Sequence, residues 1–391
     1  MTSPRPDHWN LILADFTVNV DCRYYIGEKP CKYKRLCAGC SDYSPMGTRI
    51  LIVKFGAMGD ALRTTPILTG LRRTYQPLHI TWLTDAISHP LLAGNPYIDQ
   101  LWIAGAESLA RLMSERFDLV LNFDKVPEAL ASAHLAKAAR KLGFRMTEQG
   151  TLGIYNEHSR YSWLLGLSDP IKFKLNTLTY QQMIFEMAEL SYDRASDFYS
   201  LGLGDAHRNK AAALFEQYGI RGGQPVVGLN TGCGPVFATK KWTEAGYIQL
   251  AKLLAERFHA RILLLGGKAE LERNQRIATA LGNIAINTGN DHHIKEFAAL
   301  IERCDLVVTG DTVAMHIAIA LRREVVALFG PTCHQEIDLY DRGEFVVTDF
   351  PCAPCYLKVS PMNPTCMEAL RPETVFAAAA RRLVHCGFTS R

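Results

Sequence analysis

The sequence of 391 residues lacks any long apolar run and any marked excess of one charge. No stretch approaches the roughly 18 uncharged apolar residues that a membrane-spanning helix needs. Its 43 basic and 39 acidic residues give a formal net charge of +4, too balanced for a protein dedicated to binding nucleic acid. The first residues show no basic stretch followed by an apolar core and a cleavage site, so no signal peptide is expected. We therefore expect a cytoplasmic protein with no nucleic-acid partner and at most peripheral contact with membranes.

The composition also excludes an intrinsically disordered or fibrous protein. Glycine and proline are scattered and apolar residues recur throughout. Hydrophobic and charged residues make up 48% and 21% of the sequence, as in ordinary globular proteins. This pattern excludes intrinsic disorder and collagen-like repeats. At about 150 residues per domain, the length predicts two to three domains.

Apolar runs that alternate with helical patterns predict an α/β fold. The run at 49–53 is continuous and β-branched, as in a strand covered on both faces. The alternation continues through strands at 79–83 and 118–122, is harder to parse over 150–205, and restarts at 225–229. Two such arrays predict two Rossmann-like domains with parallel sheets that face a central cleft. We expect four segments: a Cys-rich module at 1–48, domains at 49–220 and 221–372, and a C-terminal helix at 373–391.

Two turns place polar residues at the sheet edge where ligands bind in such folds. Gly59 and Asp60 follow the first strand at a helix start, where backbone amides favour anions, although Asp60 could simply cap its helix. The run Gly310–His316 forms a second strand–turn–helix, with Thr312 at a helix N-terminus that suits a diphosphate. His316 lies on the same helical face as Thr312 and could instead serve only packing.

Charged residues in other loops of the second array could contact the same ligand. Lys240 and Lys241 follow the loop at 230–234, where a phosphate clamp and an ordinary solvated surface are both open interpretations. Glu270 lies at the same edge, where its carboxylate could accept hydrogen bonds from ribose or sugar hydroxyls.

These loops together resemble a known family. The motifs are G-x-M-G-D at 56–60, a basic residue and Trp at 241–242, G-G-x-x-E at 266–270, G-D-T-x-x-x-H at 310–316 and L-F-G-P-T at 328–332. In this order they resemble the heptosyltransferases of glycosyltransferase family 9 over residues 49–372. The resemblance implies the GT-B fold and inverting transfer of heptose from ADP-heptose, or a related nucleotide sugar, to the inner core of lipopolysaccharide. It also implies that the C-terminal helix crosses back to the first domain.

The resemblance further implies roles for individual residues. Asp60 would be the general base and Lys240 would stabilise the departing diphosphate, which calls for no catalytic metal. Glu270 would contact the nucleoside part of the donor. The other expected donor-binding residues are Thr231, Gly232, Gly310, Asp311, Thr312 and His316. Gly59 and Arg63 are expected on the side of the acceptor, an anionic glycolipid or a protein.

Two departures from the family pattern leave alternatives open. Val313 replaces the glycine that commonly follows Asp-Thr, and a β-branched side chain there crowds an approaching phosphate. The loop at 230–233, Asn-Thr-Gly-Cys, replaces the more common Pro-Gly-Ala. The chain could therefore be an inactive protein that binds nucleotide sugars or assists assembly. It could also be a protein heptosyltransferase of the autotransporter type with a cysteine-bound metal. The oligomeric state stays open.

Eleven cysteines without an export signal favour metal ligands or reduced thiols over disulfides. The first cluster lies in a segment too small for its own core, and four thiolates on Zn or Fe would hold it together; it consists of Cys22, Cys31, Cys37 and Cys40. The second cluster resembles the iron-binding cysteines of family members that modify autotransporters; it consists of Cys333, Cys352, Cys355 and Cys366. Reduced structural thiols are the alternative for both clusters, and which cysteines share a site stays open.

Overall fold

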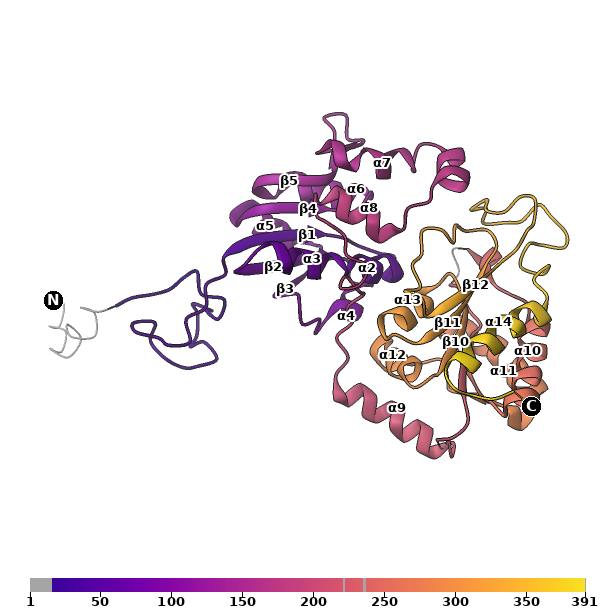
Figure 1. The fold of residues 1–391 in the computed structure, drawn as a ribbon. Helices are drawn as coiled ribbons and strands as arrows, with labels where there is room; N and C mark the ends of the chain where they lie inside the picture. Colours follow the sequence, from indigo (N-terminus) through magenta and orange to yellow (C-terminus); the bar gives the residue numbers. More distant parts are fainter. Residues whose placement is uncertain (1–15, 221, 235–236, 391) are drawn as a thin grey trace, which may run out of the picture.

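The computed structural model describes residues 16–220, 222–234 and 237–390, and most of them form two α/β domains (Figure 1). Positions 1–15 of the predicted Cys-rich module lie outside the described residues, as do positions 221 and 391 of the other predicted segments. Within the described ranges, no helix is both long and apolar enough to cross a membrane.

The first domain is built on a six-stranded sheet. Its strands are β1 (Thr48–Val53), β2 (Leu78–Thr84), β3 (Gln100–Ile103), β4 (Arg116–Asn122), β5 (Lys137–Met146) and β6 (Leu152–Ile154). They lie in the order β3-β2-β1-β4-β5-β6, and every pair is parallel except β5 with β6. In β1, Ile50 lies opposite Ile80 of β2 and Leu119 of β4. The strand occupies the middle of the sheet because its apolar side chains are buried on both faces.

Helices cover both faces of this sheet. They are α2 (Met58–Thr64), α3 (Ile67–Thr74), α4 (His89–Leu92), α5 (Ala106–Ser114), α6 (Pro127–Leu135), α7 (Arg160–Leu164) and α8 (Tyr180–Met187), with short helices η1 (Glu157–Ser159) and η2 (Ile171–Leu175). Leu68 of α3 and Phe185 of α8 belong to the apolar layer on one face. Leu112 of α5 and Ala129 of α6 belong to the layer on the other. The sheet is therefore the middle layer of three.

The second domain repeats this plan. Its strands are β7 (Val226–Asn230), β8 (Arg261–Leu265), β9 (Ala285–Asn287), β10 (Leu306–Gly310), β11 (Glu324–Phe329) and β12 (Gly343–Val347). Its helices are α10 (Glu244–Phe258), α11 (Leu271–Leu281), α12 (Ile294–Glu302), α13 (Val313–Ala320) and α14 (Pro372–His385), with short helices η3 (Ala238–Lys240), η4 (Lys268–Glu270) and η5 (Gly282–Ile284). The strand order is β12-β11-β10-β7-β8-β9, and all pairs are parallel. Both sheets thus have the doubly wound order 3-2-1-4-5-6, which creates a ligand-binding switch point between the first and fourth strands. The predicted fold class is confirmed.

One predicted domain limit and the predicted course of the C-terminal helix are wrong. Helix α9 (Asp205–Gln217) was expected in the first domain, but it packs against α12, and its Ala211 and Phe215 join the core of the second domain. The chain therefore leaves the first domain before α9. The C-terminal helix does not cross back either, since α14 packs on α10 and on β10, β11 and β12 (Figure 1). Its Val375 and Leu383 are buried there, so the second sheet already covers the apolar face of the helix.

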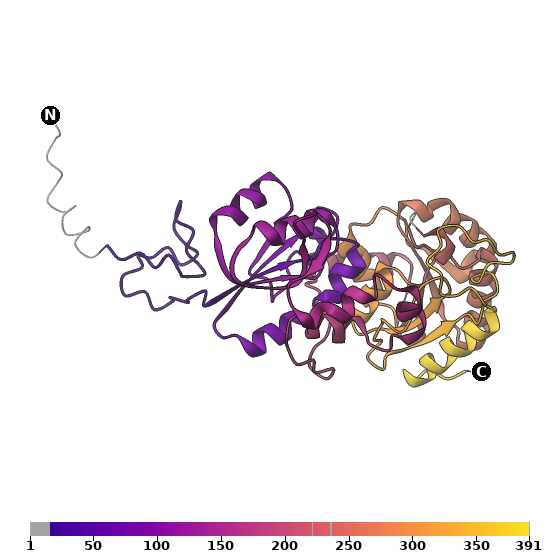
Figure 2. The same cartoon turned by 90° about the horizontal axis from the view of Figure 1, so that it is seen from above.

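The described part of the Cys-rich module, residues 16–47, extends from the start of β1 away from the second domain (Figures 1 and 2). It consists of turns and one isolated bridge between Cys22 and Pro45. Nη2 of Arg23 donates to the backbone oxygen of Leu78 at 3.0 Å and so ties the module to β2. The module lies at the amino end of β1, opposite the end that carries Asp60.

Candidate active site

The ends of β1 and β4 are clamped together at the switch point of the first sheet. Lys54 follows β1 and is buried, and its Nζ lies 2.8 Å from Oδ2 of Asp124, which follows β4. The Phe55 amide donates to the same oxygen at 3.0 Å. Burial alone lowers the pKa of Lys54, but Tyr180 and Asp124 outweigh it and raise that pKa. A buried cation therefore lies beside the loop that leads to Asp60.

Asp60 lies in the first turn of α2, and its side chain is 38% exposed. Its Oδ1 is 2.9 Å from Nε of Arg63, one turn along the same helix. The N-cap position belongs to Ala57, so Asp60 is not the capping residue. Burial raises the pKa of Asp60, but Arg63 and then Lys54 outweigh burial and lower that pKa to about 2. The carboxylate is therefore ionised at physiological pH and remains partly accessible.

Arg63 connects Asp60 to the second domain. Its guanidinium lies over the Tyr180 ring, 4.0 Å from the ring centre, and approaches Oε2 of Glu336 to 3.6 Å. The Tyr180 amide donates to the backbone oxygen of Glu336 at 2.9 Å. With 16% of its side chain exposed, Arg63 is largely enclosed by these partners. Its expected contact with the acceptor stays a prediction, whereas its contact with Asp60 is direct.

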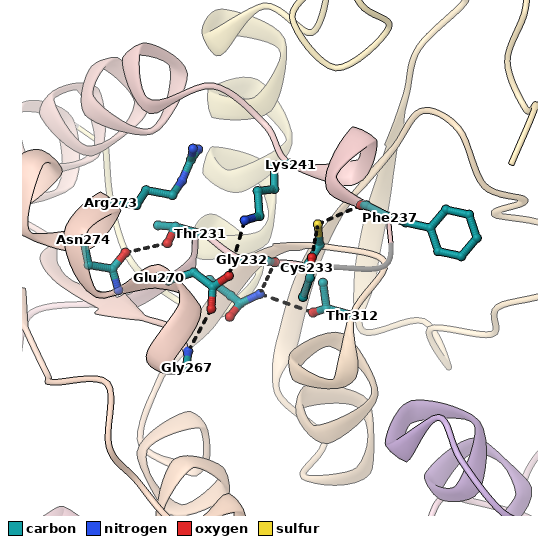
Figure 3. Close-up of polar contacts among 12 residues, drawn as sticks. Thr231, Gly232, Cys233, Phe237, Lys241, Gly267, Glu270, Arg273, Asn274 and Thr312 are labelled. Carbon is teal, nitrogen blue, oxygen red and sulfur yellow. Dashed lines mark hydrogen bonds and ion pairs between the residues drawn. The ribbon is translucent and has the colours of Figure 1, made fainter. Parts of the chain in front are cut away.

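In the second domain, hydrogen bonds join the loops after β7 and β10. Nδ2 of Asn230 donates to Oγ1 of Thr309 at 3.1 Å and to Oγ1 of Thr312 at 3.2 Å. The adjacent Thr231 donates to Oδ1 of Asn274 in α11 (Figure 3). The unusual Asn230 of this loop therefore fixes the turn from which α13 begins.

Lys240 lies at this turn. Its Nζ donates to the backbone oxygen of Asp311 at 2.7 Å and lies 3.4 Å from Oδ2 of the same residue. Helix α13 begins at Val313, and the first amides of a helix have no intrahelical partners. A cation and a helix N-terminus therefore coincide, which suits an anion. Val313 itself packs against the core of the domain.

A cluster of polar side chains adjoins this turn, where the loops after β7 and β8 meet (Figure 3). Glu270 is buried there, its Oε2 accepts from the Gly267 amide at 3.1 Å, and its Oε1 lies 3.7 Å from Nζ of Lys241. Position 232 requires glycine, since a Cβ there would lie 2.2 Å from Cδ of Glu270. Within the described residues, Oε1 of Glu270 has no hydrogen-bond donor, so it is suited to accept one from a ligand.

The two halves of the site meet where α2 contacts α13. A Cβ at Gly59 would lie 2.6 Å from Cδ2 of His316, so only glycine permits this approach. His316 is buried, and its Nδ1 lies 3.3 Å from the Tyr199 hydroxyl. Burial, followed by the charge of Arg63, lowers the pKa of His316 to about 4. Its imidazole is therefore neutral near pH 7, and the predicted neighbours Asp60 and His316 lie on helices in direct contact.

Sequence reasoning missed the groups that enclose the site from less regular segments, among them Tyr180, Tyr199 and Glu336. It also missed Lys125, whose Nζ donates to the backbone oxygen of Ser162 at 3.0 Å. Burial, with a smaller effect of Lys172, lowers the pKa of Lys125 to about 8. The position of Lys125 shortly after β4 is the sequence feature that could have identified it. The other residues follow no strand or motif, so the sequence carried no signal for them.

The cysteines of the first cluster border one cavity, whereas those of the second are divided. Cys22, Cys31, Cys37 and Cys40 line the same small cavity in the Cys-rich module. In the second cluster, burial and then the neighbouring Cys352 and Cys355 raise the pKa of Cys366. Cys333 instead has its amide 3.2 Å from the Tyr356 hydroxyl. Over the described ranges, no three His, Cys, Asp or Glu side chains are already placed to hold one metal ion, so metal binding stays a prediction.

Known proteins resemble this chain in sequence and in fold. The model of glycosyltransferase family 9 (heptosyltransferase) matches residues 107–365. Lipooligosaccharide heptosyltransferase 2 of Campylobacter jejuni is 32% identical over 170 residues, 42% of this chain and 53% of the relative, so the chain spans about half the length of that protein. Lipopolysaccharide heptosyltransferase 1 of Pseudomonas aeruginosa is 26% identical over 333 residues, 81% of this chain and 88% of the relative. The structure of Escherichia coli ADP-heptose lps heptosyltransferase II has a TM-score of 0.63 at 19% identity and covers 87% of this chain and 100% of its own.

Two facing Rossmann-like domains that meet where α2, with Asp60, contacts α13 have the architecture of the GT-B class. The fold shared with the Escherichia coli structure agrees with this assignment. Because the family model matches more than half of the sequence, the chain belongs to glycosyltransferase family 9.

Proposed function

We propose that this protein is an inverting glycosyltransferase that moves heptose from ADP-heptose to a hydroxyl of a lipopolysaccharide core acceptor. Family membership and the activities in the names of its relatives support heptosyl transfer. One observation carries the proposal: α2, which bears Asp60, contacts α13 of the second domain, and Lys240 donates to Asp311 at the turn before α13. The proposed base and the proposed anion-binding turn would thus face each other across the domain boundary.

The donor diphosphate would occupy the turn before α13. Lys240 and the first amides of that helix supply positive charge, which stabilises the diphosphate as it departs. Glu270 would hold the nucleoside, because its Oε1 is available to accept a hydrogen bond from a ribose hydroxyl. Because Gly232 has no side chain, the Glu270 carboxylate fits against it.

Asp60 would accept the proton of the acceptor hydroxyl. With a pKa of about 2 it is a weak base, but a hydroxyl oxygen becomes far more acidic as it bonds to the sugar carbon. Proton transfer to Asp60 therefore becomes favourable late, during C–O bond formation. Attack by the acceptor on one face of the sugar while the diphosphate leaves from the other inverts the anomeric centre.

The acceptor side of the cleft would favour negative charge. Burial, followed by the charge of Lys172 and, more weakly, that of Lys54, lowers the pKa of Lys125 to about 8, so positive charge gathers near the carboxyl end of β4. An anionic core oligosaccharide would relieve the repulsion among these cations. We therefore propose a phosphorylated or acidic glycolipid, rather than a neutral sugar, as the acceptor.

The substitution Asp60→Asn tests the proposed base, since it removes the charge with little change in shape. We expect kcat for transfer from ADP-heptose to a heptose-free lipopolysaccharide core to fall by about 10²–10⁴-fold. The affinity for ADP, measured by calorimetry, should stay within a few fold. Asp118→Asn is the matched control, since that carboxylate accepts the Arg49 amide at 2.7 Å at the other end of the sheet. Full turnover by the Asp60→Asn variant would contradict the assignment.

A further inference from the structure

The Cys-rich module holds a defined shape without a hydrophobic core. From residue 16 to residue 47, no described side chain is buried, and the segment has no helix or multi-residue strand. Segments of this size need a disulfide, a metal or a partner to fix their fold. All the cysteines of the chain within the described residues are free thiols, so disulfides do not supply the constraint.

Four cysteines instead converge on one cavity of about 130 Å³ in this module. Cys22, Cys31, Cys37 and Cys40 all line it, although the first and the last are 18 positions apart in the sequence. None of the four is buried, so their thiols gain little from apolar packing. Packing therefore does not explain why four cysteines should gather here.

Each of the four cysteines also begins a tight turn, in which its carbonyl accepts a hydrogen bond from the amide three residues later. The bonds run from Tyr25 to Cys22 (2.9 Å), from Lys34 to Cys31 (2.9 Å), from Cys40 to Cys37 (3.2 Å) and from Tyr43 to Cys40 (3.3 Å). Backbone hydrogen bonds therefore fix the chain at each of the four cysteines.

Two basic side chains, Lys29 and Arg35, line the cavity beside the thiols. Lys32 lies over the Tyr24 ring at 4.0 Å and near the Tyr33 ring at 4.8 Å. Arg35 pairs with Asp42 at 2.9 Å. Asp42 also lines the cavity, but its carboxylate is paired with Arg35, and the four thiols match the preference of a soft tetrahedral metal for sulfur.

We infer that Cys22, Cys31, Cys37 and Cys40 bind one Zn²⁺ ion in a closed four-thiolate site that folds the module. In the described structure the thiols border the cavity without three of them already meeting at a metal position, so binding draws them inward. Four protein ligands leave no open position on zinc, which makes the site structural. Its place at the amino end of β1 also separates it from Asp60 and the proposed reaction.

Metal content of the purified full-length protein tests this inference. We expect the double variant Cys37→Ser/Cys40→Ser to contain one zinc ion per chain fewer than the unchanged protein. The matched control is Cys386→Ser, because that exposed thiol lies outside both cysteine clusters and should leave the zinc content unchanged. Far-UV circular dichroism of the double variant should still show the cooperative melting of the two α/β domains. Equal zinc content in the double variant and the control would overturn the inference, as would iron in place of zinc.

Limited proteolysis provides a second measurement that needs no substitution. Lys32, Lys34 and Arg35 are exposed trypsin sites within the module. After treatment with a chelator we expect rapid cleavage there, and addition of zinc chloride alone should slow it at least tenfold. Unchanged cleavage with and without zinc, or disulfide-linked peptides among these four cysteines by mass spectrometry, would refute a zinc-folded module.

Discussion

Replacing Gly59 with alanine perturbs a close contact between the two domains, that of α2 with α13. The new Cβ would lie 2.6 Å from Cδ2 and 3.2 Å from Nε2 of His316. The shorter distance is about 1 Å inside an ordinary carbon–carbon contact. The imidazole cannot easily retreat, since it is buried and its Nδ1 meets the Tyr199 hydroxyl. Either the ring or the start of α2 must therefore move.

The magnitude follows from two opposing effects. Overpacking a buried contact costs about 1–3 kcal/mol, and alanine in a helix returns at most about 1 kcal/mol relative to glycine. We expect the free energy of unfolding to fall by roughly 1–2 kcal/mol. A shift of about 1 Å at the adjacent Asp60 should also lower kcat by about 100-fold.

Urea denaturation and steady-state transfer assays measure both effects. Gly105→Ala is the control, because a Cβ there meets nothing within 4 Å. Combining Gly59→Ala with His316→Ala removes the ring that the methyl group meets, so the stability losses should be less than additive. Additive losses, or a Gly59→Ala variant as stable as the control, would refute the close contact of α2 with α13.

Two further predictions concern titration. Arg63→Gln removes the cation beside Asp60, so the pKa of Asp60 should rise. The acid limb of the pH profile of kcat/KM should then move to higher pH, and Arg63→Lys should largely restore the original profile. An acid limb that is unchanged in both variants would contradict the ion pair. The pKa of His316 is lowered from 6.5 to about 4, so as pH falls through that window the unfolded chain binds a proton before the folded chain does, and stability is lost. His316→Gln should reduce the slope of unfolding free energy against pH between these values, and an equal slope would show that other groups cause it.

The sequence predicted those strands that can be recognised from a continuous apolar run or from the turn that follows them. β1 is a continuous apolar run, and β10 ends in the Gly-Asp-Thr turn, so both could be placed from neighbouring residues alone. β5 was missed because Lys137–Met146 carries basic residues throughout and has no apolar run. It forms a strand because β4 offers hydrogen bonds along its edge, which is a tertiary cause.

The residues of the candidate site also fall into two groups, those that the sequence predicted and those whose contacts depend on the tertiary structure. Asp60, Lys240 and Glu270 follow strands or motifs, so their place at the sheet edge follows from the sequence. That Arg63 pairs with Asp60 and approaches Glu336 depends on how the domains meet, which no spacing encodes.

The sequence by itself determined two doubly wound domains, the family, and which residues lie in the turns after the strands, because strand–turn–helix units are specified by local apolar patterns and turn residues. Only the tertiary structure decided where the chain crosses between domains, on which sheet α14 packs, and that Gly59 lies against His316. These features depend on the fit of surfaces from distant parts of the chain. Such a fit is a property of assembled side chains, so it leaves no periodic signal in the sequence.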